Sequence, residues 1–280
     1  MLDSLDNKKI KTSLIVYAAI IPFLILILFP FAVMITTSLK VKAATLTFPP
    51  NWIPRPAVFR NYIDMFKAIP LARLFINTSI IASGTTILVL FSAIPAAYAL
   101  IRFNLPGRSY IMFIILITQM FAPATMLVAL YKLIAMFGLI DSYLVLIIVD
   151  AAFVLPFSIW LLVSFLRRIP LEIFDAALID GASDIKTAFK IVIPIAKPGI
   201  VTMVIYAFIF AWNEFIFAMT LLTSYKKRVL NIGIFALVGK WDVHWNYLLG
   251  AAFISTIPIL FLFLIIEKHL AKGITAGAIK

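Results

Sequence analysis

Long hydrophobic runs, separated by short polar connections, dominate this chain. A helix needs about 20 apolar residues to cross a hydrocarbon core of about 30 Å. Six runs with few or no charges reach this length, so the pattern predicts an all-α integral membrane protein with six transmembrane helices in a single domain, residues 1–280. The predicted spans cover residues 14–38, 74–101, 110–131, 143–166, 198–222 and 247–266.

Five of these runs contain an internal proline. Proline is costly in an exposed soluble helix but is tolerated in membrane bundles, where neighbouring groups satisfy the freed carbonyls. The prolines therefore predict kinked helices around a cavity; they include Pro22, Pro95, Pro123, Pro156 and Pro258. The first run is longer than the 7–15 residues of a signal-peptide core, which favours a retained span.

Composition agrees with a membrane protein. Hydrophobic residues make up 64% of the chain and charged residues 13%, against about 45–50% and about 25% in soluble domains. The net charge of +12 lies in the short connections, where it suits anionic lipid or an acidic partner better than nucleic acid. The sequence has no cysteine, which excludes a disulfide framework and a thiolate metal site. His244 and His269 are too far apart to indicate a metal centre.

The charges of the connecting loops give only a weak signal for the orientation of the chain in the membrane. Lys and Arg divide almost equally between the loops predicted on the two sides of the membrane. Arg102 with Arg108, and Arg167 with Arg168, favour a cytoplasmic location for their connections and therefore for both termini. On the opposite side, the proline-rich run at residues 48–54 predicts an interfacial turn segment anchored by Trp52.

The connection at residues 167–197 has a two-helix pattern. Pro170 suits the start of a helix, and Glu172 and Asp175 place negative charge in its early turns. Gly181 is expected to end this helix, and Ser183 is a good N-cap for a second one.

The second helix is predicted to carry an apolar stripe that packs back on the bundle. The stripe has the spacing i, i+3, i+4, i+7 and comprises Ile185, Ala188, Phe189 and Val192. Pro194 and Pro198 end the helix and restart the chain as the fifth span. Two short helices at an angle form a knob that can enter a cleft in another protein. From periodicity alone, an amphipathic helix in the headgroup layer explains the same pattern.

The same loop resembles the EAA loop of the permease subunits of bacterial ABC importers. An acid, two alanines, a glycine six positions after the acid, an isoleucine and a proline recur there at this spacing; the matching residues are Asp175, Ala176, Ala177, Gly181, Ile191 and Pro194. Asp replaces Glu, which keeps the charge with a shorter reach, and Ile193 replaces Leu. Asp180 and Ala182 suit the carbohydrate branch of the family.

The resemblance covers most of the chain and is greatest for the smaller six-span permease of maltose-type sugar importers. Supporting segments are Asn61-Tyr62, Leu155-Pro156-Phe157 with Trp160, Ala211 to Phe215, and Gly273 to Gly277. It implies a type I ABC importer permease fold in a bacterial or archaeal cell membrane, with a cytoplasmic coupling loop. The implied partners are a second permease, two cytoplasmic ATPases and an external solute-binding protein.

The resemblance also implies a transport subunit without catalytic chemistry of its own. The sequence lacks a Gly-x-x-x-x-Gly-Lys-[Ser/Thr] phosphate loop. No cofactor is therefore expected on this chain, and ATP and Mg are expected to be used by the partner ATPases.

Polar residues inside spans are candidates for the translocation pathway, since an ionisable group there is costly and usually faces protein or water. Glu214, near the middle of the fifth predicted span, either is satisfied by a neighbouring helix or lines a cavity. Asp150, nearer the outer end of the fourth, is a candidate for simple hydration. The other candidates supply hydrogen-bonding or aromatic groups and are Asn213, Trp212, Tyr206, Phe210 and Gln119.

Other functions compete with sugar import. Importers of amino acids, peptides or a polyol phosphate share the loop, although the tail and the Trp-Asn-Glu-Phe segment favour sugar. An ion-coupled secondary transporter could use Glu214 and Asp150, but it leaves the loop unexplained. A membrane enzyme needs converging nucleophile, base or metal ligands, and the sequence shows none.

Overall fold

The structure is a computed structural model that describes residues 2–103, 105–239 and 243–275, with side chains from residue 16 to 265 except 104, 178 and 240–242. Regular structure in this part of the chain is helical, apart from one isolated antiparallel bridge between Val238 and Val243. The chain divides into two compact units: residues 1–70 with 234–256, and residues 71–233 with 257–280. Each unit is described by itself.

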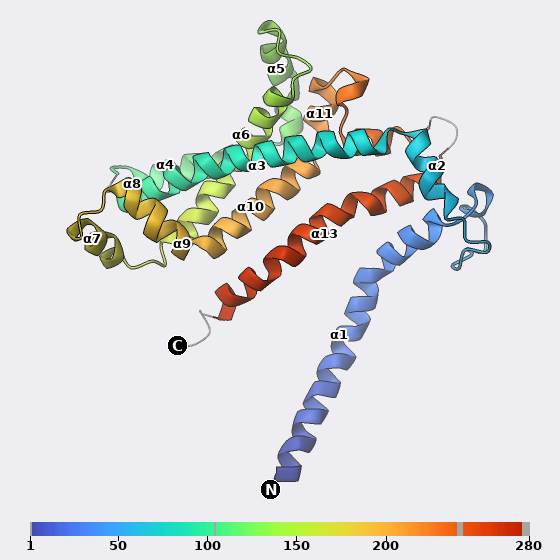
Figure 1. Cartoon of the computed structure of the whole chain (residues 1–280), viewed down its shortest axis with the longest axis horizontal. Helices are drawn as coiled ribbons and strands as arrows, with labels where there is room; N and C mark the ends of the chain where they lie inside the picture. Colours follow the sequence, from blue (N-terminus) through green and yellow to red (C-terminus); the bar gives the residue numbers. More distant parts are fainter. Residues whose placement is uncertain (1, 104, 240–242, 276–280) are drawn as a thin grey trace. The chain divides into compact units, whose positions relative to one another are not determined.

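The long helices of the chain are joined by shorter ones. The elements are α1 Leu2–Ser38, η1 Lys42–Ala44, α2 Arg60–Ala68, α3 Leu71–Arg102, α4 Arg108–Ile117, η2 Thr118–Met120, α5 Pro123–Met136, α6 Tyr143–Leu166, α7 Leu171–Ile179, α8 Asp184–Thr187, η3 Ala188–Val192, α9 Ile193–Ile195, α10 Lys197–Trp212, α11 Ile216–Leu221, η4 Tyr225–Lys227, α12 Leu230–Phe235 and α13 Trp245–Thr275. Figure 1 labels most of them.

In the first unit, α2 is fastened to the end of α1. The Asn61 side chain donates hydrogen bonds to the carbonyls of Ser38 and Lys40, both at 2.8 Å. The hydroxyls of Ser38 and Tyr62 also share a hydrogen bond of 2.8 Å. The Asn61-Tyr62 pair noted in the sequence therefore has a local role, since it satisfies carbonyls at the end of a helix.

The core of the second unit lies where α3, α6 and α10 pack against one another (Figure 1). Its buried residues include Val89, Val154, Leu162 and Met203. Gly199 permits close approach of α10 to α6, because a Cβ atom at this position would lie 2.5 Å from the Phe165 ring. Small residues at such crossings are typical of helices packed in membranes.

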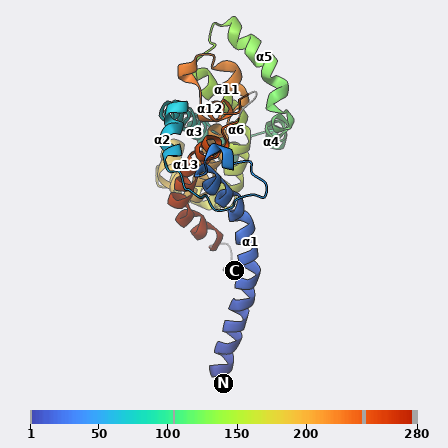
Figure 2. The ribbon, with the colours of Figure 1, turned by 90° about the vertical axis from the view of Figure 1, so that its right-hand side faces the viewer.

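Four of the six predicted spans are single helices long and apolar enough to cross a membrane: Val16–Ser38, Leu71–Arg102, Tyr143–Leu166 and Trp245–Ile265. The third predicted span bends sharply near Pro123, one of the prolines expected to kink a helix. Arg108–Met120 and Pro123–Met136 meet at 92°, and α5 turns away from α4 in Figure 2. Proline drives the preceding residue out of the helical region, and Ala122 is extended, with ψ 134°. The structure thus holds four spans, or up to six if each bent helix pair is one span.

The fifth predicted span is also broken. Its helix α10 ends at Trp212, the chain continues without helix through residues 213–215, and α11 begins at Ile216. At its other end, Asp184–Ile195 and Lys197–Trp212 meet at 82°. The Asn231 side chain forms hydrogen bonds with backbone groups at this break. It donates to the carbonyls of Trp212 and Glu214 at 3.2 and 3.3 Å. Broken helices are tolerated in membranes where such partners exist.

Residues 222–230 are held against the start of α3 and against the turn before α6. Asn77 donates to the carbonyls of Lys226 and Arg228 at 2.9 and 2.8 Å. The Asp141 carboxylate accepts from the Ser224 amide at 3.0 Å and pairs with Lys227 at 3.1 Å. Burial raises the pKa of Asp141. Hydrogen bonds from Ser224 and Lys227, together with the positive charge of Lys227, outweigh this effect and leave the pKa of Asp141 below its usual value.

Candidate functional site

The first helix of the 167–197 loop ends at Gly181, as predicted. Gly181 has φ +78°, and the amides of Asp180 and Ala182 donate to the carbonyls of Ala176 and Ala177, both at 3.0 Å. These bonds form a glycine-terminated helix end that satisfies the last carbonyls. A Cβ atom at Gly181 would meet nothing within 4 Å. The backbone conformation, and not a lack of space, therefore requires glycine here.

The second helix begins as predicted at Ser183, whose hydroxyl accepts from the Lys186 amide at 3.3 Å. The predicted apolar stripe is only half correct. Val192 is buried, whereas Ile185 and Phe189 are 73% and 63% exposed. A π turn over Ala188–Val192 interrupts the 3.6-residue period on which the prediction rested.

The remaining loop residues lie on both sides of the knob formed by α7 and α8. Ala177 is buried against the bundle, while Ala176, Asp180 and Pro194 are exposed; Ala182 and Ile191 are half-buried. Ile179, at the end of α7, is 86% exposed. The knob therefore presents apolar side chains outward, as a surface that docks in a partner does.

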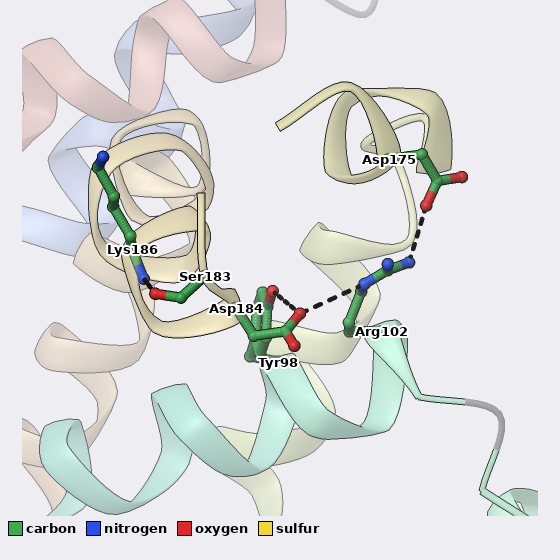
Figure 3. A network of polar contacts seen from close by, with 6 residues as sticks. All are labelled: Tyr98, Arg102, Asp175, Ser183, Asp184 and Lys186. Atoms are coloured by element: carbon green, nitrogen blue, oxygen red, sulfur yellow. Dashed lines mark hydrogen bonds and ion pairs between the residues drawn. The ribbon is translucent and has the colours of Figure 1, made fainter. Parts of the chain in front are cut away.

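One arginine ties both helices of the knob to the end of α3 (Figure 3). The Arg102 guanidinium contacts the carboxylates of Asp175 at 3.0 Å and Asp184 at 3.6 Å. The Tyr98 hydroxyl, one turn back on α3, donates to Asp184 at 3.3 Å. The Tyr98 ring packs on the buried Phe174 of α7 at 6.0 Å between centroids. The knob is thus fixed to the end of α3 by charge and by an aromatic contact.

A cavity of about 680 Å³ lies at the break after α10. It brings together four predicted pathway residues: Tyr206, Phe210, Asn213 and Glu214. The Glu214 carboxylate accepts from the amides of Phe217 and Ala218, both at 2.7 Å. Both proposals for Glu214 therefore hold in part: it caps the first turn of α11 and also lines the cavity.

Three other pathway candidates are not among the residues that line this cavity. Trp212 is buried, stacked on Phe208 with ring centroids 5.5 Å apart. Gln119 is exposed and donates to the Phe153 carbonyl at 2.9 Å. Asp150 is fully buried in α6, without the exposed surface that hydration near the outer end would require.

Sequence reasoning missed the partners that complete these sites. Arg102 entered only as an orientation signal, and Tyr98 and Asp184 were not singled out. Their separation in the chain hid the contacts, because Arg102 lies on α3 and both acids lie in the loop after α6. The sequence did offer one signal. Arg102 is a cationic residue at the end of its predicted span, and the connection that follows it was assigned to the same side of the membrane as the 167–197 loop.

The class of protein follows from these features: a helical membrane protein with broken spans, a cavity at one break and an exposed two-helix knob. The family described as "Binding-protein-dependent transport system inner membrane component" matches residues 89–276. The chain belongs to this family. It is therefore a multi-pass inner membrane component of a transport system.

Relatives and a solved structure agree. The chain is 33% identical to the sulfoquinovosyl glycerol transport system permease protein SmoH of Agrobacterium fabrum, covering 90% of this chain and 89% of that protein. It is 32% identical to the trehalose/maltose transport system permease protein MalG of Thermococcus litoralis, covering 98% and 99%. A bacterial ABC transporter involved in alginate import matches with a TM-score of 0.77 at 23% identity, covering 92% of this chain and 96% of that chain. The fold is thus that of a type I ABC importer permease.

Proposed function

We propose that this chain is the permease subunit of an ATP-driven importer for a sugar or oligosaccharide. It forms half of the translocation pathway and receives mechanical work through the 167–197 loop. The observation that carries the proposal is family membership together with two relatives whose names specify a trehalose/maltose and a sulfoquinovosyl glycerol transport system.

The knob is the proposed coupling element. Its outward apolar residues, Ile179, Ile185 and Phe189, provide a surface for a cleft in a cytoplasmic ATPase. The contacts of Arg102 with Asp175 and Asp184 transfer a push on the knob to α3, in addition to the covalent path into α6. Closure of the ATPases on ATP would rock the bundle as a rigid body and open the cavity to the other side. ATP and Mg belong to the ATPases.

The cavity at the helix break is the proposed solute path. Tyr206 and Phe210 offer aromatic faces, and Asn213 and Glu214 offer polar groups, in a space of about 680 Å³. Such a mixture of apolar walls and a few polar groups is typical of small-molecule sites. Two hydrogen bonds from the backbone hold the Glu214 carboxylate in place, so it presents its remaining lone pairs in a fixed direction.

The proposed assembly contains a second permease, two ATPases and an external solute-binding protein. Both termini are proposed to be cytoplasmic. The contacts at the ends of α3 and α6 support an alternation of the connections, because Arg102 meets the 167–197 loop at one end while Asn77 and Asp141 hold residues 222–230 at the other. The connections therefore fall into two groups, as alternate loops of a multi-pass protein must.

Affinity purification tests the proposal. The tagged chain, extracted in mild detergent, should bring down a second permease and an ATPase. Gly181→Trp should lose or uncouple the ATPase while remaining in the membrane, because a non-glycine residue at φ +78° costs about 1–2 kcal/mol and would deform the knob.

Gly181→Asn is the matched control, since asparagine adopts positive φ more readily. It should keep the ATPase and most transport activity. Normal transport by Gly181→Trp, or a stable wild-type chain that recovers no ATPase, would contradict the proposal.

A further inference from the structure

The segment between α1 and α2 folds back beside α1 and encloses a small cationic cavity. A backbone hydrogen bond from Val58 to Leu39, at 2.8 Å, closes the segment at its base. The cavity has a volume of about 140 Å³, the space of roughly four or five water molecules. Lys40, Asn51 and Arg55 are its polar lining residues.

Lys40 is held at this cavity by the fold. The residue is only 8% exposed, and its carbonyl accepts a 2.8 Å hydrogen bond from the Asn61 side chain. Among the described residues, neither Lys40 nor Arg55 forms an ion pair. Two cationic side chains that line one small cavity repel each other unless a counter-charge lies between them. The cavity is therefore built for an anion that this part of the chain does not supply.

The location of the segment points to the membrane interface. The Trp52 ring contacts Phe29 of α1, with 5.7 Å between centroids. Phe29 lies nine residues before the end of α1 at Ser38, or about 13 Å along the helix. Tryptophan at that depth marks the boundary between headgroups and acyl chains. The cationic cavity thus lies close to the level of lipid phosphates.

The surface around the cavity is apolar and outward-facing. Leu46, Phe48, Trp52 and Ile53 are 58–95% exposed. A soluble anion would leave these side chains in water, whereas a phospholipid would cover them with acyl chains while its phosphate enters the cavity. Two cations favour a headgroup of net negative charge over a zwitterionic one, which carries its own ammonium.

We propose that this cavity binds the phosphate diester of an anionic phospholipid in the leaflet at the C-terminal end of α1. Lys40 provides a point charge, and Arg55 provides a planar fork that matches phosphate oxygens. This site is separate from the pathway and from the coupling loop, and it requires only that α1 cross the membrane.

Lipid retention measured by native mass spectrometry tests the site. The full chain, purified with the subunits that accompany it, is equilibrated with phosphatidylglycerol or with phosphatidylcholine. Phosphatidylglycerol should bind more tightly. Each of Lys40→Met and Arg55→Gln should weaken its binding about fivefold, and both together about thirtyfold.

The matched control removes the same charge from α2, with Arg60→Gln and Lys67→Gln. Arg60 pairs with Asp64 on the helix surface and lies outside the cavity lining. This control should leave the preference for phosphatidylglycerol unchanged. If Lys40→Met fails to fold, Arg55→Gln alone decides, because Arg55 is an exposed side chain.

Three results would overturn the proposal. The first is a lack of selectivity or of dependence on the two cations. It would be seen as equal retention of the two lipids by the wild type, or as unchanged lipid binding in the double variant. The second is displacement of the lipid by millimolar inorganic phosphate or glycerol phosphate, which would make the cavity a soluble-anion site. The third is unaltered lipid binding with lost capture of the solute-binding protein, which would assign the two cations to a protein carboxylate.

Discussion

At the scale of single residues, the helix ends in both sites depend on a backbone conformation or on side chains that form hydrogen bonds with free backbone groups. Gly181 supplies a left-handed conformation that ends α7, and Ser183 caps α8. At the break after α10, Glu214 accepts hydrogen bonds from the first amides of α11, and Asn231 donates one to the last carbonyl of α10. A helix that stops inside a membrane domain needs such groups, because water is not available to replace them.

Glu214 provides the residue-scale prediction. Replacement by leucine removes both acceptors from the first turn of α11 and should destabilise the protein by about 2–4 kcal/mol. Glu214→Gln keeps one side-chain oxygen and should cost about 1 kcal/mol. Thermal unfolding in detergent measures both.

Transport separates the two roles of Glu214. If the carboxylate also contacts solute, Glu214→Gln should lower transport by more than its loss of stability explains. Equal thermal stability of Glu214→Leu and the wild type would contradict the capping role.

At the scale of elements, the important feature is the junction between α3 and the knob. Arg102 is 19% exposed, while its partners Asp175 and Asp184 are 60% and 44% exposed. Exposed ion pairs contribute about 1 kcal/mol or less to stability. Arg102 therefore matters more for the position of the knob than for the stability of the fold.

Replacement of Arg102 tests this positioning role. Arg102→Gln should change the unfolding temperature little but lower ATP-dependent transport. The chain has no cysteine, so spin labels at Ile80→Cys on α3 and Ile179→Cys on α7 report the position of the knob. Arg102→Gln should broaden the distribution of distances between the two labels.

Two further variants sharpen this test. Arg102→Lys should restore part of the order, because it keeps the charge but lacks the fork that reaches two acids. Lys197→Gln removes a positive charge at the start of α10 and should leave the label distance unchanged. A sharp wild-type distance in Arg102→Gln would rule out the proposed role.

At the scale of the whole molecule, connections at the two ends of the bundle are fastened by different chemistry. The knob end uses Arg102 with two acids, and the other end adds the Asn77 amide and the Ser224 hydrogen bond to an ion pair between Asp141 and Lys227. Because these contacts join segments far apart in the chain, they contribute to the cooperativity of the second unit as a whole.

Asp141 gives a pH-dependent prediction at this scale. Its pKa is lowered in the folded protein, so its stabilisation is complete above the unfolded value of about 3.9 and is lost as the pH falls through the folded value. Asp141→Asn keeps a residue that tolerates the positive φ of this position, 64°. At pH 7 it should lower stability by about 1–2 kcal/mol, or several degrees in Tm.

The difference in Tm between the wild type and Asp141→Asn should shrink as the pH is lowered from about 6 to below about 4. Thermal unfolding of both proteins across this range measures it, and the difference removes effects that the two proteins share. A difference that stays constant with pH would contradict the charge-based contribution.

The sequence by itself determined the all-α membrane architecture, the locations of the apolar runs and the two-helix form of the 167–197 loop. These features depend on local information: length of apolar runs, a glycine, a serine cap and prolines. Only the tertiary structure decided that the third and fifth runs are broken, that Ile185 and Phe189 face outward, and that Arg102 joins the knob to α3. The physical reason is that a run of apolar residues indicates only that the segment avoids water. Whether its helix is interrupted depends on side chains elsewhere in the chain, such as Asn231, that form hydrogen bonds with the freed backbone carbonyls.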